Sequence, residues 1–312
     1  MARVAAFSRD SKQFANGEEA TLRNSCVLPG GRGGVTTGRD GRNAIELRDV
    51  AFSYDRTRRF IEGVSLGFEK GALTSVVGPN GCGKSTLLKI ACGIIRPRRG
   101  EVLLEGRPME AYAARERARR LALLSQGPRP PAMSVESLVA CGRFPHSSGQ
   151  GRLSRADREA VEYAMELADV TRFRSCDVGR LSGGERQRAF IAMTLSQDAD
   201  IVVLDEPTTY LDIGACHDVM RLVRRLNEEH GKTIVLVIHD LDLALRYSDK
   251  VVVVRDGSVI GEGEVGAVYE SRAIDEAFGI DLHACEALGG DAYVVFPRAS
   301  ARPVWAGSTG EG

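Results

Sequence analysis

The stretch GPNGCGKST, at residues 78–86, lies between a short apolar stretch, LTSVV, and an apolar helix-like stretch, KSTLLKIACGII. It fits the pattern G-x-x-x-x-G-K-[ST], in which glycines let successive backbone N–H groups turn toward one phosphate. The start of the following helix adds about half a positive charge. In a chain of this length a chance match has odds of roughly one to three per cent. The stretch therefore predicts a nucleotide-binding loop between a strand and a helix.

Two side chains of this loop carry its chemistry. Lys84 supplies a positive charge for the β- and γ-phosphates, and the hydroxyl of Ser85 is suited to ligate Mg²⁺. Cys82 occupies a variable position and is interpreted as a tolerated small residue, although we expect its alkylation to block ATP binding sterically. The predicted nucleotide contacts in the loop are Gly78, Pro79, Asn80, Gly81, Cys82, Gly83, Lys84, Ser85 and Thr86.

Three acidic residues lie close together in LDEPTTYLD, residues 204–212, after a further apolar stretch. Carboxylates at the end of a buried strand must be paired, solvated or metal-bound. Alone, such a pair is usually a solvated turn, but a bound magnesium nucleotide requires oxygen ligands. We expect Asp205, at the end of the strand beside the phosphate loop, to serve the metal, and Glu206 to point elsewhere and polarise the attacking water.

The order of strand-like and helix-like stretches predicts an α/β fold. Short β-rich stretches occur at AIELRDVAFSY, GVSLGFEKG and LTSVVG, and again at IVVLD, IVLVIH and KVVVVRDGSVI. SRADREAVEYAMELADV reads as a helix that opens with a capping box of Ser154 and Asp157. ACHDVMRLVRRLNEEHG reads as a helix with Gly231 as its C-cap. Alternating strands and helices indicate right-handed parallel βαβ units, which bind ligands at the carboxyl ends of the strands.

The chain divides into three regions, the second of which contains an inserted subdomain. Residues 1–43 are rich in Gly and Arg without an apolar period, and they are predicted to be a flexible extension. Residues 44–270 form the main domain, and a helical block at about residues 127–190 interrupts its alternation as an inserted subdomain. Residues 271–312 are a C-terminal appendix with one predicted strand, AYVVF.

Composition narrows the classes of partner. Lys+Arg and Asp+Glu both number 42, so no overall field favours a nucleic acid. The longest apolar stretches fall short of the about 20 residues that span a bilayer, and the first residues lack the apolar segment of a signal peptide. The seven cysteines are scattered without a CxxC pattern, which favours reduced thiols. We expect a soluble, cytosolic protein that recognises phosphate locally.

Together with LSGGERQR at residues 181–188, these motifs resemble the ATP-binding subunits of ABC transporters. The resemblance covers about residues 44–270, with several separate motifs in the expected order. It implies a P-loop, RecA-like core with an N-terminal antiparallel β subdomain and an inserted helical subdomain. It also implies ATP and Mg²⁺ as cofactors, and hydrolysis of ATP to ADP and phosphate.

The resemblance gives roles to residues that carry little information alone. Tyr54 matches the aromatic residue that stacks on adenine, Gln126 the glutamine that reaches Mg²⁺ and water, and His239 the histidine at the γ-phosphate. Asp205 and Glu206 match the metal-side aspartate and the catalytic glutamate. Without the resemblance, Tyr54 would be read as a packing residue and His239 as a structural one.

The signature segment implies a second subunit. Ser182 offers a hydroxyl, and Gly183 and Gly184 offer backbone N–H groups at a helix start, which together suit an anion. Glu185 replaces the commoner glutamine of the family. The segment is far in sequence from its own phosphate loop, and in the family it closes on the nucleotide of a partner subunit. Asp212 matches the loop that crosses to that partner, so the resemblance implies a head-to-tail dimer with two ATPs.

Two short segments favour one type of transporter. DEPTTYLDI and GRFPH, the latter at residues 142–146, resemble the ATPases of iron–siderophore, haem and cobalamin importers. His146 itself is interpreted as a solvated loop histidine. The resemblance implies integral membrane permease subunits as partners, a second ATPase subunit, a substrate-binding protein acting indirectly, and a position on the cytoplasmic face of the membrane.

Two other classes of function remain open. A soluble ABC-type ATPase acting on ribosomes or DNA usually carries two cassettes or a long coiled coil, whereas this chain has one phosphate loop and no heptads between residues 84 and 181. A nucleotide-gated module without catalysis would have a degenerate site, whereas Lys84, Glu206 and His239 are all present. An ABC importer for a different cargo is a third alternative.

Overall fold

The computed structural model describes residues 43–54, 60–127, 130–147, 153–287 and 290–297. These segments all fall within residues 39–312, which hold together as one unit through their contacts. The predicted flexible extension, apart from Asn43, lies outside the described residues. In the described ranges no helix combines the length and apolarity needed to cross a membrane.

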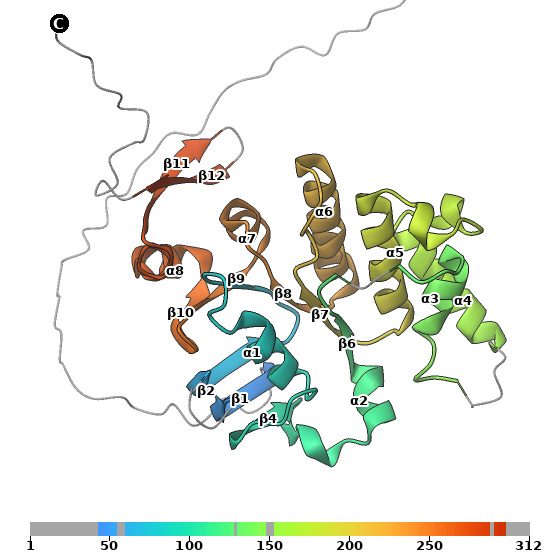
Figure 1. Ribbon diagram of the computed structural model, residues 1–312, viewed down its shortest axis with the longest axis horizontal. Helices are drawn as coiled ribbons and strands as arrows, with labels where there is room; N and C mark the ends of the chain where they lie inside the picture. The colour runs from blue at the N-terminus through green and yellow to red at the C-terminus, as the bar shows by residue number, and fades with distance from the viewer. Residues whose placement is uncertain (1–42, 55–59, 128–129, 148–152, 288–289, 298–312) are drawn as a thin grey trace, which may run out of the picture. The chain divides into compact units, whose positions relative to one another are not determined.

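The centre is a six-stranded sheet with the strand order β10-β9-β3-β8-β7-β6 (Figure 1). All neighbouring strands are parallel except β9 and β10, which confirms the predicted parallel βαβ arrangement. One detail of the prediction is wrong: β8 lies between the strand that precedes the phosphate loop, β3, and the strand that ends at Asp205, β7. The strands are β3 (Leu73–Val77), β6 (Leu121–Leu124), β7 (Ile201–Asp205), β8 (Thr233–Val237), β9 (Lys250–Arg255) and β10 (Ser258–Glu264).

Both faces of this sheet are buried. In β8, Ile234 and Leu236 belong to one apolar core, and Val235 and Val237 belong to the other. Successive side chains of a strand point to opposite faces, so a strand buried on both faces is apolar at nearly every position, although β3 also buries Thr74 and Ser75. This is why these strands read as continuous apolar runs in the sequence.

Side chains of an antiparallel sheet form part of one of the two apolar cores. Its strand order is β2-β1-β4-β5, and its residues Ile45 and Phe68 pack in the same core as Leu87 of α1 (Lys84–Ala91). β1 and β2 confirm two predicted strands, whereas β4 and β5 were not predicted. The strands are β1 (Asn43–Phe52), β2 (Ile61–Glu69), β4 (Arg99–Leu104) and β5 (Arg107–Pro108).

Helices α3, α4 and α5 pack together, as Figure 1 shows. The predicted capping box is present at the start of α4, where the Ser154 side chain accepts from Asp157 N and the Asp157 side chain accepts from Ser154 N. Helix α5 continues to Ser196, beyond the predicted end of the helical block at about residue 190. The elements of this region are α3 (Val135–Cys141), α4 (Arg155–Leu167), η2 (Thr171–Phe173), η3 (Val178–Arg180) and α5 (Gly183–Ser196).

The remaining helices connect the strands. Gly231 ends α6 in a left-handed conformation with φ of 62°, which confirms the predicted C-cap. These helices are η1 (Met109–Ala111), α2 (Ala114–Arg120), α6 (Ile213–His230), α7 (Leu241–Tyr247), α8 (Val265–Glu270) and α9 (Ala273–Phe278).

The C-terminal region differs from its prediction. AYVVF lies in a strand, β12 (Gly290–Pro297), as expected, but it pairs with a second strand, β11 (Ile280–Ala287), that was not predicted. In β11 the apolar residues Ile280, Leu282 and Ala284 alternate with the polar residues Asp281 and His283, so this strand does carry a strand-like pattern in the sequence.

Candidate functional site

The phosphate loop is a tight turn between β3 and α1 that depends on glycine. Gly78 and Gly83 have φ values of 157° and 110°. A Cβ built at Gly78 would lie 2.1 Å from the carbonyl oxygen of Val254 in β9. Gly81 also has a positive φ of 77°, but a Cβ there would meet nothing within 4 Å. The loop therefore needs glycine at Gly78 for space and at Gly81 for backbone conformation.

Lys84 lies buried inside the loop. Its Nζ donates hydrogen bonds to the carbonyl oxygens of Gly78, at 2.8 Å, and Pro79, at 2.9 Å. A buried ammonium must be compensated by acceptors, and here the loop supplies them. A phosphate in the loop would offer stronger, charged acceptors to the same three donors of the ammonium.

The side chains of Ser85 and Asp205 are in contact, although β8 lies between the strand that precedes the phosphate loop and the strand that ends at Asp205. The Ser85 hydroxyl donates to Asp205 Oδ1 at 3.0 Å, and Asp205 is 4% exposed. Burial raises the pKa of the Asp205 carboxyl, while the hydrogen bond from Ser85 acts in the opposite direction. A partly buried hydroxyl beside a buried carboxylate matches the hard oxygen ligands that Mg²⁺ takes in nucleotide sites, so these residues fit the predicted metal.

The Glu206 carboxylate contacts both of the other predicted catalytic residues. Gln126 Nε2 donates to Glu206 Oε2 at 2.5 Å, and His239 Nε2 lies 2.7 Å from Glu206 Oε1. Gln126 follows β6, Glu206 follows β7 and His239 follows β8, so the carboxyl ends of three neighbouring parallel strands bring them together. The Glu206 side chain is only 9% exposed.

One further contact to Glu206 has no counterpart in the sequence prediction. The Thr209 hydroxyl donates to Glu206 Oε2 at 3.0 Å. The residue types in PTTY do not distinguish the two threonines, because which of them faces the carboxylate depends on the backbone of the turn. The one signal in the sequence is the separation of three residues, at which a side chain can reach back across a turn.

Tyr54 lies beside the phosphate loop. Its hydroxyl is 2.9 Å from the Thr86 hydroxyl, and its ring packs edge-on against Phe52 and Phe60. The side chain is 62% exposed. Neighbours that contact the ring edge-on while the residue stays exposed are compatible with stacking of a flat ligand on the ring.

The signature segment forms the start of a helix, and side chains of the segment itself provide the N-terminal cap. Ser182 is the N-cap of α5, and both its backbone N–H and its hydroxyl donate to Glu185 Oε2, at 3.0 and 2.8 Å. These hydrogen bonds lower the pKa of the Glu185 carboxyl. A Cβ at Gly184 would lie 3.0 Å from Ala215 Cβ, so the segment packs against the start of α6. Asp212 is the N-cap of α6 and accepts from Ala215 N at 2.8 Å.

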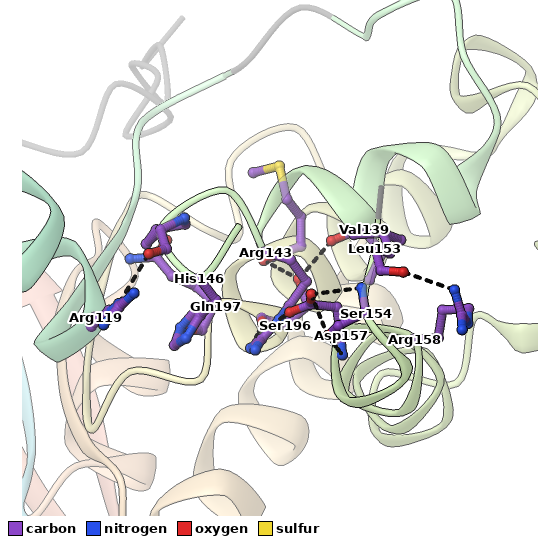
Figure 2. A network of polar contacts seen from close by, with 12 residues as sticks. Arg119, Val139, Arg143, His146, Leu153, Ser154, Asp157, Arg158, Ser196 and Gln197 are labelled. Atoms are coloured by element: carbon purple, nitrogen blue, oxygen red, sulfur yellow. Dashed lines mark hydrogen bonds and ion pairs between the residues drawn. The ribbon is translucent and has the colours of Figure 1, made fainter. Parts of the chain in front are cut away.

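The segment GRFPH is tied inward by a buried polar network, shown in Figure 2. Arg143 donates to Asp157 Oδ1 at 2.9 Å and to the Ser196 carbonyl oxygen at 2.8 Å. The prediction for His146 is wrong, because His146 is partly buried and its Nε2 lies 2.9 Å from the carbonyl oxygen of Gln197. Its environment is set by α5, which sequence alone does not place beside it.

Network contacts also reach the central sheet. Arg119 of α2 donates to the Pro145 carbonyl oxygen at 2.9 Å, and Gln197 Nε2 donates to the Leu121 carbonyl oxygen at 3.0 Å. Cys82, Cys92, Cys141, Cys176 and Cys216 are free thiols, and Cys82 is among the buried ones.

Comparisons with known proteins place these observations in one family. Residues 61–209 match the family model described as ABC transporter. The petrobactin import ATP-binding protein FpuD of Bacillus anthracis is 40% identical over 76% of this chain and 87% of its own length. The iron(3+)-hydroxamate import ATP-binding protein FhuC of Bacillus subtilis is 39% identical over 77% of this chain and 89% of its own. The hemin import ATP-binding protein HmuV of Pseudomonas putida is 38% identical, covering 70% and 86%.

Solved structures show the same fold. A dimeric ATP-binding cassette in a post-hydrolysis state, bound to ADP and phosphate, is 28% identical with a TM-score of 0.61, covering 71% of this chain and 98% of that one. An inward-facing, metal-chelate type ABC transporter matches with a TM-score of 0.71 at 23% identity, covering 83% and 100%.

Proposed function

Because this chain belongs to the ABC transporter family as an ATP-binding subunit, we propose that its hydrolysis of ATP drives the import of an iron–siderophore complex. The proposal of this cargo is supported by relatives named for petrobactin and iron(3+)-hydroxamate import. A relative named for hemin import keeps haem as the second candidate. No residue of this subunit is expected to touch the cargo, so the cargo follows from kinship rather than from the site.

One observation carries the assignment of the hydrolytic site. Gln126 and His239, from two separate segments, both meet the carboxylate of Glu206 at hydrogen-bond distance. A separate motif predicts each of the three residues, and a packing role for any one of them would not require the three side chains to meet. In the proposed site Glu206 acts on the attacking water, and His239 stabilises charge on the γ-phosphate.

The remaining residues bind and orient the nucleotide. Tyr54 stacks on the base, and the backbone N–H groups of residues 78–86 surround the phosphates. Lys84 exchanges its bonds to the Gly78 and Pro79 carbonyl oxygens for phosphate oxygens. Ser85, Asp205 and Gln126 would hold Mg²⁺, which when bound neutralises phosphate charge. Phosphoryl transfer depends on positioning and electrostatics, which is what these groups supply.

The complete site needs a second subunit. Ser182, Gly183, Gly184 and Glu185 of one copy would close on the nucleotide of the other, with Asp212 facing across the interface. The dimeric cassette with bound ADP and phosphate supports this arrangement by similarity of fold and sequence. We propose that such a homodimer sits on the cytoplasmic face of the membrane against permease subunits, and that its closing and reopening drive them.

Replacement of Glu206 by glutamine tests the hydrolytic site. Glutamine keeps the shape and hydrogen-bonding reach of the side chain but removes the charge that polarises water. We expect Glu206→Gln to bind ATP normally and to hydrolyse it about 100- to 1,000-fold more slowly, by analogy with loss of a transition-state hydrogen-bond donor. Phosphate release and binding of a fluorescent ATP analogue are the two measurements.

Glu159→Gln is the matched control, since Glu159 lies on α4 in an exposed ion pair with Arg155. This control should retain wild-type turnover. Near-normal turnover by Glu206→Gln would refute the assignment of Glu206.

For the cargo, ATPase activity with the cognate permease in proteoliposomes should rise with a ferric siderophore-loaded binding protein and not with a haem-loaded one; the reverse result would favour haem.

A further inference from the structure

Three hydrogen-bond donors meet the carboxylate of Glu206, and they differ in their origin. Gln126 and His239 come from the segments that follow β6 and β8. Thr209 comes from the same turn as Glu206, and its hydroxyl donates to Oε2 at 3.0 Å. Thr209 and Gln126 share one carboxylate oxygen, and His239 contacts the other.

The turn that holds Thr209 has a defined backbone. Glu206 and Tyr210 both have left-handed φ values, 55° and 65°. Glu206 N donates to the Val237 carbonyl oxygen of β8 at 3.0 Å, and Leu211 N donates to the Thr208 carbonyl oxygen at 3.3 Å. The two ends of the turn are therefore tied by backbone bonds that do not involve the Thr209 hydroxyl.

The other two donors have a second task in the proposed reaction. The Nε2–H of His239 that faces Glu206 Oε1 cannot at the same time donate to a phosphate oxygen. Gln126 must likewise turn toward the metal and its water. Both residues lie on segments separate from the turn of Glu206. Their hydrogen bonds to the carboxylate are therefore lost or weakened when the two residues bind the nucleotide and its metal.

We propose that Thr209 is the positioning residue that keeps the Glu206 carboxylate oriented while Gln126 and His239 serve the nucleotide. A glutamate side chain has three rotatable bonds, and a displacement of about 1 Å in a reacting group can lower a rate 100-fold. Threonine suits this role because its branched Cβ restricts χ1, which holds its hydroxyl in one direction. The inference rests on the proposed catalytic role of Glu206.

Replacement of Thr209 by valine removes the hydroxyl and keeps the branched shape. Since a hydrogen bond to a charged group is worth about 1.5–3 kcal/mol, we expect Thr209→Val to lower kcat roughly 10- to 100-fold. The KM for ATP and the binding of a fluorescent ATP analogue should stay at wild-type values. Thr209→Ser, which keeps the hydroxyl, should recover most of the lost kcat, and Thr209→Ala should behave like Thr209→Val if the valine variant folds poorly.

Thr171→Val is the matched control. The Thr171 hydroxyl is buried without a hydrogen-bond partner among the described residues, so its loss should leave kcat unchanged. Wild-type kcat in Thr209→Val, a rise in KM without a fall in kcat, or a serine variant as slow as the valine variant would each overturn the inference. Equal thermal midpoints for Thr209→Val and the wild type would show that a lower kcat does not come from unfolding.

The double variant Glu206→Gln/Thr209→Val separates this inference from the proposed function. If Thr209 acts through Glu206, adding Thr209→Val to Glu206→Gln should lower kcat no further. If Glu206→Gln itself turns over normally, the proposed role of Glu206 fails. If Glu206→Gln is slow but Thr209→Val is normal, only the role of Thr209 fails.

Discussion

At the residue scale, the two adjacent acids at the end of β7 serve different partners because the backbone reverses between them. Asp205 is the last residue of the strand and bonds Ser85, whereas Glu206 takes a left-handed conformation with φ of 55°. Such a conformation costs a residue other than glycine on the order of 1–3 kcal/mol. The bond from Glu206 N to Val237 and the three donors on its carboxylate offset that cost.

Cys82 should react slowly with alkylating reagents. The residue is 6% exposed, and burial raises the pKa of its thiol, so little reactive thiolate is present near neutral pH. We expect iodoacetamide to modify the exposed Cys141 and Cys176 first and Cys82 much later, with a rate that rises with pH. Once Cys82 is modified, ATP binding should be lost.

Mass spectrometry of peptides, sampled with time and paired with an ATP-binding assay, measures both effects. Cys92 is the internal control, because it is fully buried and burial raises its pKa to about 12. It should react no faster than Cys82. Full ATP binding after complete modification of Cys82 would contradict the prediction.

The positions of site residues were predictable where the motif itself fixes the geometry, whereas their roles stay predictions. Lys84 and Ser85 follow a glycine pattern that leaves the backbone few alternatives, and Asp205 ends an apolar strand. Thr209 and His146 could not be predicted, because their partners lie across a turn and on another helix. The contact of Glu185 with Ser182 has a signal in the sequence, because S-x-x-E at residues 182–185 has the spacing of a capping box.

At the element scale, the buried ion pair of Arg143 and Asp157 joins the segment after α3 to α4, and Arg143 also donates to the last carbonyl oxygen of α5. Both residues are 6% exposed. Removing one partner of a buried ion pair leaves the other charge uncompensated, at a cost of about 3–5 kcal/mol. We therefore expect Arg143→Met to lower the free energy of unfolding by that amount, measured by urea denaturation. Glu159→Gln, in the exposed pair with Arg155, should cost about 0–1 kcal/mol, and an equal effect of the two variants would disprove the claim.

The same ion pair predicts a pH dependence. Hydrogen bonds from Ser154 and Arg143 lower the pKa of Asp157 from 3.8 to about 2. A lowered pKa stabilises the fold above the ordinary value of 3.8, and this contribution is lost as the pH falls toward 2. The difference in unfolding free energy between the wild type and Asp157→Asn should therefore be smaller at pH 3 than at pH 6. A difference that is constant or larger at pH 3 would contradict the assignment.

The elements were predictable in proportion to their apolar pattern. Strands β3, β7, β8 and β9 are buried on both faces and read as apolar runs, so each was expected. β4 is exposed over its first three residues, β5 and β6 have only two and four residues, and α2 has no buried residue in the sequence ARERARR, so none of them shows a period that could be read. The order of strands in the sheet, with β8 between β3 and β7, comes from tertiary packing and leaves no local signal.

At the scale of the whole molecule, the proposed dimer predicts complementation between two inactive variants. Lys84→Met would disable the phosphate loop, and Ser182→Arg would disable the segment that closes on the partner's nucleotide. Each homodimer should then be inactive. An equimolar mixture should recover activity, because half of the dimers combine the variants and each of these has one intact site, about a quarter of all sites.

The measurement compares the ATPase activity of the mixture with the ATPase activity of each variant alone. A mixture as inactive as its components, with mixed dimers present by native mass spectrometry, would contradict the shared site. Full activity of Ser182→Arg alone would contradict it as well.

The sheet order has a consequence for how the protein is made. β3 lies between β8 and β9, and a Cβ at Gly78 would collide with Val254 of β9, so the phosphate loop is shaped by residues from the last third of the chain. On the ribosome the antiparallel sheet of β1, β2 and β4 can form early, whereas β3 emerges with all five residues apolar or buried and no neighbour to pair with. Long-range parallel pairing is slow, and an unpaired apolar strand is prone to aggregate. The loop that is synthesised among the first motifs is thus among the last to acquire its shape.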